Sequence, residues 1–202
     1  MPTEKLRPHL PAFLVQVLAT TVGLLLALGL DQWRDRRRQE ALASQHLRSI
    51  QSELLGNDQE IAQELKSFAA TEALLAEALM CLEQGRRPDP DRRLSLSLAT
   101  LRQSSWDMAV AGQTPLRSDL GRMARLATAY EGLRTLRSVQ DQVLAEMEIL
   151  EALGGLLEHG RLPGHLPRTE AMTRLRALRS KLVLIGNLAP SVRSDLAKAL
   201  QP

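Results

Sequence analysis

The side chains best suited to bind a metal or to act as a nucleophile are few in this chain. They are four histidines and one cysteine: His9, His46, Cys81, His159 and His165. His159 and His165 could supply two metal ligands, but Glu158 is the only carboxylate beside them, and zinc sites use three or four protein ligands. Cys81 stands between two apolar residues without a histidine nearby, which favours a small buried side chain over a nucleophile. We expect no metal, no cofactor and no catalytic residue.

Motifs typical of enzymes are also missing from the sequence. It contains no GxSxG turn, no HExxH motif and no glycine-rich phosphate loop. Acidic residues are spread along predicted helices at three or four residues from an arginine, as in Glu131 with Arg134 and Glu170 with Arg174. That spacing is typical of ion pairs on a solvated helix face. The sequence therefore predicts a protein that is not an enzyme.

Trp106 and Tyr130 are conspicuous because aromatic residues make up only 2% of the chain. They could line a ligand pocket between helices, where helical bundles bind small molecules. Alternatively they fill the core where a short helix crosses a long pair, and each would bury a large area there. We favour the core interpretation.

The elements that would position these residues follow an apolar segment. Ala12 to Leu30 carry no charge, and as a helix they would span roughly 28 Å, close to the hydrocarbon thickness of a bilayer. We predict a tail over 1–11, a single-pass transmembrane helix with an interfacial turn over 12–33, and a helical bundle domain over 34–202. Two alternatives are a cleaved signal peptide followed by a soluble periplasmic helical domain, and a buried helix of a soluble core. The length of the run and its lack of a polar face disfavour both.

The flank and one face of the apolar segment carry residues with specific roles in membranes. Trp and Arg favour the membrane–water boundary and lipid headgroups, and the residues concerned are Trp33, Arg34, Arg36, Arg37 and Arg38. Small residues every four positions let two membrane helices approach closely, and here they are Ala19, Gly23 and Ala27. Counting Lys and Arg on the two sides places the C-terminal domain in the cytoplasm by a small margin, so the orientation stays open.

The composition excludes other classes of protein. The net charge of +3 comes largely from the arginines beside the apolar segment, and no basic patch with interleaved aromatics indicates nucleic-acid binding. A single cysteine cannot form an intramolecular disulfide. Leu and Ala dominate the apolar residues, and Asn-Gly hairpin turns are absent, so we expect an all-α fold.

Apolar residues spaced by three, four or seven positions divide the remaining chain into helices. The first runs from 34 to about 83, and its phase continues through Gly56-Asn57, which favours one continuous helix over two. The later predicted helices cover 94–102, 104–110 with a serine cap, 116–158, 169–185 and 190–200, with breaks at 84–93 and 160–167. The two longest helices have similar lengths, so we expect them to pair antiparallel within an elongated, mostly antiparallel bundle with coiled-coil spacing. The residues predicted to form its core stripes are Leu47, Ile50, Leu54, Ile61, Leu65, Phe68, Leu75, Leu79, Leu82, Leu116, Leu120, Met123, Leu126, Tyr130, Leu133, Leu136, Val143, Met147, Leu150, Leu157, Leu175, Leu178 and Leu182.

Two motifs of this sequence have counterparts in a known group of proteins. The first is the run 22–28 followed by Asp31-Gln32-Trp33-Arg34, with Glu53-Leu54-x-x-Asn57 in the helix beyond. The second comprises Trp106, Ala109, Gly112, Leu116 and Tyr130. Together they resemble a widespread set of uncharacterised bacterial single-pass membrane proteins, in which a transmembrane helix precedes a helical domain. The resemblance implies an inner-membrane protein of unknown function and supplies no catalytic residue.

These observations favour a membrane-anchored interaction or scaffold module that contacts the lipid bilayer, associates with itself and binds an unidentified protein partner. A different class is a sensory or signalling input domain, in which a ligand shifts the bundle and the anchor transmits the shift to a partner. An enzyme is a third class, and the sequence offers it no convergent chemical groups.

Overall fold

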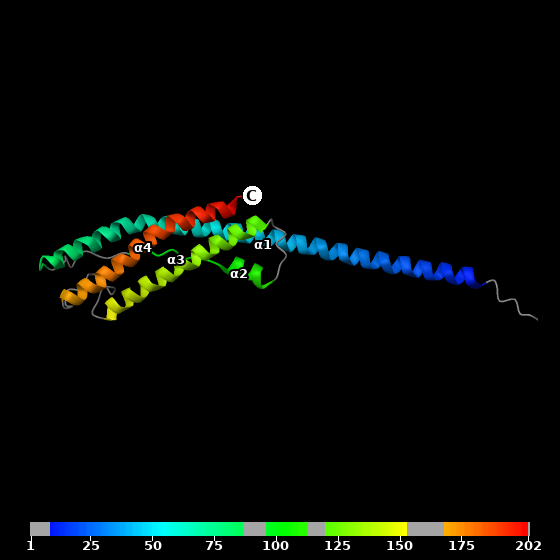
Figure 1. Cartoon of the computed structure of the whole chain (residues 1–202), viewed down its shortest axis with the longest axis horizontal. Helices are drawn as coiled ribbons and strands as arrows, with labels where there is room; N and C mark the ends of the chain where they lie inside the picture. Colours follow the sequence, from blue (N-terminus) through cyan, green and yellow to red (C-terminus); the bar gives the residue numbers. More distant parts are fainter. Residues whose placement is uncertain (1–8, 87–95, 113–119, 153–167, 202) are drawn as a thin grey trace, which may run out of the picture.

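The structure of the protein is a computed structural model that describes residues 9–86, 96–112, 120–152 and 168–201. Its helices are α1 (His9–Glu83), α2 (Ser104–Ala111), α3 (Leu120–Ala152) and α4 (Arg168–Leu200). These residues contain no strand, and three long helices lie along one another while the first part of α1 projects from one end (Figure 1). The prediction of an all-α, elongated bundle is confirmed.

Helix α1 runs without a break for 75 residues. Leu54 and Ile61, on either side of Gly56-Asn57, are fully buried, so the apolar stripe keeps its phase through the glycine. The prediction of one continuous helix is confirmed at this point. Residues 31–33, which include the predicted interfacial turn, are also helical, because they include no proline or glycine that would interrupt the backbone hydrogen bonds.

Helix α4 runs antiparallel to both α1 and α3. Two contacts with each helix show the direction: Arg193 with Asp58 and Arg176 with Glu83 on α1, and Val192 with Gly132 and Lys181 with Glu146 on α3. As the residue number rises along α4, the number of the residue that it contacts on α1 or α3 falls. Helix α4 therefore joins the two other long helices along the length of the bundle.

Helices α1 and α3 run parallel, so the prediction that the two longest helices pair antiparallel is wrong. Glu53 of α1 meets Tyr130 of α3, and further along both helices Glu64 meets Gln140. The direction follows from the connection, because the chain leaves the far end of α1 and is beside Glu53 again at Ser105. The chain thus returns to the start of the bundle before α3 begins.

This return is extended in its described part, residues 96–103. Residues 53–83 of α1 cover about 45 Å, and an extended chain covers the same distance in roughly 14 residues. Leu96 to Gln103 are not helical, so the helix predicted over 94–102 is wrong there, and residues 94 and 95 lie outside the described part. Ala99 and Leu101 are buried on alternate positions. The backbone partners of this extended chain are side chains of helices and not a strand.

Helix α4 continues through Gly186 and Pro190, where the sequence predicted the end of one helix and the start of another. Proline lacks an N–H and crowds the carbonyl four residues earlier. Pro190 is exposed, however, and the buried stripe continues through Ile185, Ala189 and Val192. Burial of this stripe outweighs the local stop signals, because tertiary packing overrides helix propensity.

The predicted break after α1 is confirmed at Gly85, which has a φ of 75°. The amide of Arg86 donates to the carbonyl of Cys81, as in a Schellman cap that lets glycine end a helix. The described part of α3 is shorter than the predicted helix over 116–158, and residues 116–119 and 153–158 lie outside the described part.

The predicted apolar stripes form the core of the bundle. Most of their members are buried, including all three predicted in α4. Leu47, Leu65 and Met123 are half-buried, and Leu120 is 87% exposed at the first residue of α3. Two predicted core residues lie outside the described part: Leu116 and Leu157.

Candidate functional site

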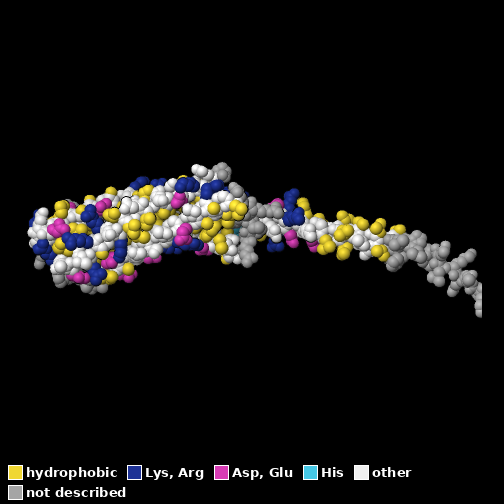
Figure 2. Space-filling model, in the orientation of Figure 1, with side chains coloured by type: hydrophobic (Ala, Val, Ile, Leu, Met, Phe, Trp, Pro, Cys, Tyr) yellow, Lys and Arg dark blue, Asp and Glu magenta, His cyan; other side chains and the backbone are white. Residues whose placement is uncertain are grey.

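The apolar part of α1 lies outside the bundle. From Val15 to Leu30 its large apolar side chains are exposed, and none of the most apolar 18-residue window is buried. Figure 2 shows hydrophobic side chains gathered on the projecting helix. By length and composition this helix could cross a membrane, a test that a signal sequence also passes. Its exposure excludes the alternative of a helix buried in this chain's own core.

The residues predicted for the membrane boundary follow on the same exposed helix. Trp33 is 53% exposed, and the guanidinium carbon of Arg37 lies 4.9 Å from the centre of its ring, which is a cation–π contact. Arg34, Arg36 and Arg38 are exposed as well. An aromatic ring and four cations therefore lie within about two helical turns of one another.

The small residues Ala19, Gly23 and Ala27 are exposed along α1. Apart from the turns of its own helix, nothing lies within 4 Å of the position that a Cβ on Gly23 would take. This face is open to a second helix, and its use in pairing two anchors stays a prediction.

A buried carboxylate organises the start of the bundle. Oε1 of Glu53 accepts a hydrogen bond of 2.6 Å from the Tyr130 hydroxyl. Oε2 accepts one of 2.9 Å from the Ser105 amide and one of 3.1 Å from the Ser104 hydroxyl. The residue at the cap position of α2, Gln103, makes no side-chain cap. The predicted serine cap is therefore wrong, because α2 is capped by a carboxylate of α1, which the helix dipole favours.

Trp106 and Tyr130 stack on each other beside this carboxylate. Their ring centres are 5.0 Å apart and their planes differ by 16°. Tyr130 is fully buried and Trp106 is 8% exposed, so the structure places both in the core. Burial, together with the hydrogen bond to Glu53, raises the pKa of the Tyr130 phenol above its ordinary value of 10.0. The phenol therefore stays protonated and keeps donating.

Polar side chains hold the extended segment 96–103 by its backbone. Asn57 donates to the carbonyl of Arg102 and accepts from the amide of the same residue, both at 2.8 Å. Arg137 of α3 donates to the carbonyl of Leu101. These side chains supply the hydrogen bonds that a neighbouring strand would give in a sheet, and buried backbone groups need such partners.

A second polar pair holds the same segment further along the bundle. Nε2 of Gln140 donates to both carboxylate oxygens of Glu64, at 3.0 and 3.2 Å, and to the carbonyl of Ala99 at 3.3 Å. Burial raises the pKa of Glu64, and hydrogen bonds from Gln140 and the Ala99 backbone partly offset that rise. The two contacts keep the extended segment in step with α1. Seven helical residues from Asn57 to Glu64 rise by about 10.5 Å, and three extended residues from Ala99 to Arg102 rise by about 10 Å.

The structure brings the two sequence motifs together where Glu53 accepts from Tyr130, on which Trp106 stacks. Sequence reasoning missed the buried pair of Glu64 and Gln140. A seven-residue spacing of polar residues could have indicated it, because the members of this row are all buried: Asn57, Glu64 and Thr71.

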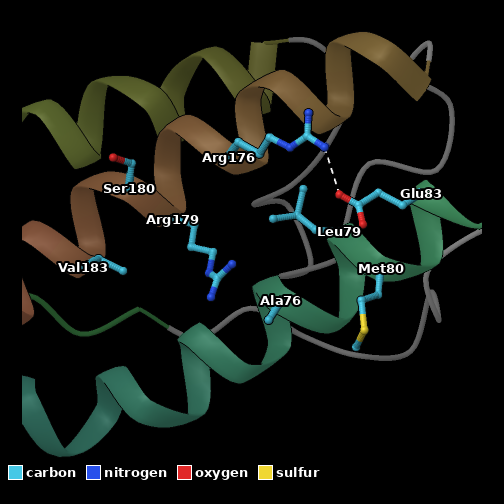
Figure 3. Close-up of a pocket in the computed structure, with 8 residues that line it drawn as sticks. All are labelled: Ala76, Leu79, Met80, Glu83, Arg176, Arg179, Ser180 and Val183. Carbon is cyan, nitrogen blue, oxygen red and sulfur yellow. Dashed lines mark hydrogen bonds and ion pairs between the residues drawn. The ribbon is translucent and has the colours of Figure 1, made fainter.

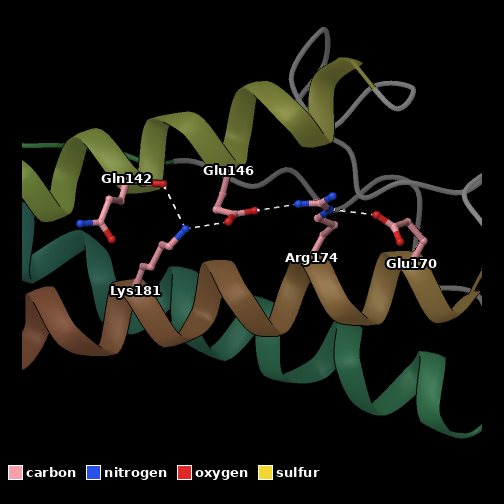
Figure 4. Close-up of polar contacts among 5 residues, drawn as sticks. All are labelled: Gln142, Glu146, Glu170, Arg174 and Lys181. Atoms are coloured by element: carbon pink, nitrogen blue, oxygen red, sulfur yellow. Dashed lines mark hydrogen bonds and ion pairs between the residues drawn. The ribbon is translucent and has the colours of Figure 1, made fainter.

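Charged side chains join α3 to α4 on the outside of the bundle (Figure 4). Lys181 lies 2.6 Å from one oxygen of Glu146, and Arg174 lies 3.7 Å from the other. Both helix ion pairs predicted from the sequence form: Glu170 with Arg174 at 2.9 Å, and Glu131 with Arg134 at 3.4 Å. This cluster is a set of mutually paired charges, which suits a contact between helices.

Two grooves open on the surface of the bundle. One, of 540 Å³, lies between α1 and α4 at the end far from the apolar segment; Met80 and Val183 line it, and Arg176 pairs with Glu83 at 2.8 Å beside it (Figure 3). The other, of 610 Å³, lies between α3 and α4 with Trp106 at its edge. Their linings combine apolar and charged side chains.

Among the described residues, no three side chains of His, Cys, Asp and Glu gather so that they could hold a metal ion. His46 and Cys81 are half-buried on α1, and the pair His159 and His165 lies outside the described part. No protein-family model matches the chain, and neither a curated protein nor a solved structure matches it.

Proposed function

We propose that the protein is a membrane-anchored helical interaction module of the bacterial inner membrane, without enzymatic activity. The observation that carries this proposal is the exposed apolar part of α1, which no other described part of the chain covers. Leaving so much apolar surface in water is unfavourable at about 25 cal/mol per Å², whereas a bilayer would cover it completely. A rim of cations at its end, Arg34 to Arg38, suits the same placement.

The uninterrupted α1 supports a scaffold role. From Leu30 to Glu83 the helix rises by about 80 Å, so it would hold the far end of the bundle at a fixed distance from the membrane. The groove beside Met80 and Val183 lies at that far end (Figure 3). A protein partner bound there would be kept away from the bilayer surface.

Membrane fractionation of the full-length protein tests the anchor. We expect the protein to stay in the membrane after alkaline carbonate washing, with its intact mass, and Leu25→Arg to reduce the membrane fraction because it places a charge in the apolar segment. Recovery in the soluble fraction with a shortened mass would instead show a cleaved signal peptide. A dual topology reporter fused after Pro202 decides the orientation, for which the Lys and Arg count favours the cytoplasm.

Self-association is the second part of this proposal. The face of Ala19, Gly23 and Ala27 is open along α1, and small residues at this spacing let helices pack closely. We expect crosslinked dimers of the membrane-bound protein to be lost in Gly23→Leu and retained in Val22→Leu, a substitution on a neighbouring face. Dimers that survive Gly23→Leu would place the interface elsewhere.

A sensory input role is the alternative that the structure favours next. Helix α1 belongs to both the apolar segment and the bundle, so a shift of the bundle would move the anchor directly. The groove edged by Trp106 would be the ligand site. If Trp106→Ala leaves the fold and the cellular phenotype of the protein unchanged, this alternative is wrong.

A further inference from the structure

The four arginines that follow Trp33 on α1 make no ion pair within the described part of the chain. Acidic partners stand at suitable spacing, because Asp31 and Asp35 precede Arg34 and Arg38 by three residues, a separation that lets side chains meet on a helix. Arg37 nevertheless lies over the Trp33 ring, and the side chains of Arg34, Arg36 and Arg38 are exposed.

Some arginines of the bundle behave differently. Five of them lie 2.6–3.4 Å from a carboxylate oxygen: Arg134, Arg174, Arg176, Arg179 and Arg193. In the bundle the chain's own carboxylates neutralise these five arginines, whereas no described carboxylate pairs with the four arginines beside the apolar segment. These four guanidinium groups are therefore available to an anion from outside the described part of the chain.

The position of these four arginines along α1 identifies the source of the negative charge. If the hydrocarbon core ends near Leu30, Arg34 lies about 6 Å and Arg38 about 12 Å beyond it. The headgroup layer occupies roughly 5–8 Å on each side of the hydrocarbon core, and long arginine side chains reach back toward it. A phosphate at this depth belongs to a lipid and not to a soluble anion.

We propose that Trp33, Arg34, Arg36, Arg37 and Arg38 form a binding site that selects anionic phospholipid headgroups over zwitterionic ones. The site rests on the proposed membrane anchor. Guanidinium groups bind phosphate oxygens in a bidentate manner, and the Trp33 ring already holds the Arg37 guanidinium at 4.9 Å. The indole lies at the membrane boundary, where its apolar ring and polar N–H are both satisfied.

The arginines surround α1 on more than one side. Seven-residue steps keep roughly the same side of a helix, so Arg36 shares the side of the fully buried Ile50, which faces the bundle. Arg34 shares the side of Leu55, which is 52% exposed and faces away from the bundle. Headgroups bound on both sides would fix the angle at which α1 leaves the membrane, and with it the position of the bundle.

Fluorescence quenching by brominated lipids tests this site. The full-length Trp106→Phe variant keeps Trp33 as its only tryptophan, and it is reconstituted into vesicles of seven parts phosphatidylcholine and three parts phosphatidylglycerol. Bromine is carried either by the phosphatidylglycerol or by the phosphatidylcholine, so the two samples differ only in the label. Flotation with the vesicles is measured first, because it tests the anchor independently of headgroup preference.

We expect the ratio of phosphatidylglycerol to phosphatidylcholine near Trp33 to exceed the bulk ratio by about fivefold, which is the effect of roughly one arginine at an anionic surface. Replacing the four arginines by glutamine should remove the enrichment while flotation is unchanged, and replacing them by lysine should keep most of it. The double variant Arg134→Gln/Arg176→Gln, in the bundle, is the matched control and should keep it fully. High salt should weaken it by screening.

If the protein floats with the vesicles but both labels quench equally per lipid, the proposed headgroup site is wrong. The proposed membrane anchor would still hold. Enrichment that persists in the four-glutamine variant would overturn the headgroup site too. A protein that does not float would contradict the proposed anchor itself. Because Trp33 lies outside the bundle, the signal reports on the flank even where Trp106→Phe loosens the core.

Discussion

Replacing Tyr130 by phenylalanine tests whether the Glu53 carboxylate organises the bundle. The change removes one oxygen atom and keeps the ring that stacks on Trp106, so it isolates a hydrogen bond of 2.6 Å. Tyr130 is fully buried and Glu53 is 8% exposed, so water does not readily replace the lost donor. Hydrogen bonds to charged groups contribute about 1.5–3 kcal/mol. We expect the free energy of unfolding to fall by about 2 kcal/mol, which lowers Tm by about 4–8 °C for a domain of this size.

The assay follows one of the two tryptophans of the chain, Trp106, after the other has been replaced. In a Trp33→Phe background, the fluorescence of Trp106 reports on the docking of α2 during urea unfolding of the full-length protein in micelles. Thr128→Ala is the matched control, because it removes an exposed hydroxyl that bonds only to the Ala124 carbonyl of its own helix, at 3.0 Å. We expect this control to change the free energy by less than about 0.5 kcal/mol.

A Tyr130→Phe protein that unfolds at the same urea concentration as the Thr128→Ala protein would refute the reasoning. A double-mutant cycle with Glu53→Gln sharpens the comparison. If the two residues act through their direct contact, the cycle should give a coupling energy of about 1 kcal/mol or more, whereas independent roles would give effects that add.

Four further substitutions test the packing and charges of the bundle in the same unfolding assay. Burial raises the pKa of Glu64 above its ordinary value of 4.5, so its contribution to stability is fully present below that pH and is lost as the pH rises through the folded pKa. As the pH rises, the wild type should therefore lose stability relative to Glu64→Gln, which cannot ionise at this position. A difference in the free energy of unfolding that stays constant with pH would contradict this. Gly186→Ala should stabilise α4 by about 0.5–1 kcal/mol because its Cβ would meet open space, whereas Gly132→Ala should gain less or lose, since its Cβ would lie 3.3 Å from Val192. Glu146→Gln, which weakens the ion pairs between α3 and α4, should cost about 1–2 kcal/mol.

The elements that depend on local pattern were predictable from the sequence. The heptad stripe through Leu54 and Ile61 predicted a continuous α1, and both residues are fully buried. The break near Gly85 was predicted from glycine and proline, and the positive φ of Gly85 shows the reason. The ion pair of Glu170 with Arg174 was predicted from helix spacing alone. In each case the signal lies within a few residues of the feature that it predicts.

The elements that depend on distant partners were not predictable in the same way. Residues 94–102 were predicted as helical because no second strand was available, yet the backbone partners of their described part include Asn57 and Gln140, far away in the sequence. The parallel direction of α1 and α3 follows from that extended return. Local stop signals also misled at Pro190, where burial of Ala189 and its neighbours continued the helix.

The buried polar row of α1 has a consequence for what this helix can pair with. A helix with an apolar heptad stripe from Leu47 to Leu82 is suited to self-association through its core face. Such a symmetric pair would bring the carboxylates of two Glu64 side chains, and of two Glu53 side chains, into one apolar seam. Buried carboxylates without a hydrogen-bond partner are strongly unfavourable, and like charges add to that cost. Within one chain the same groups are satisfied by Tyr130 and Gln140 of α3. The polar row therefore favours the intramolecular bundle over a coiled coil of two α1 helices, and confines self-association to the apolar segment and the outer faces.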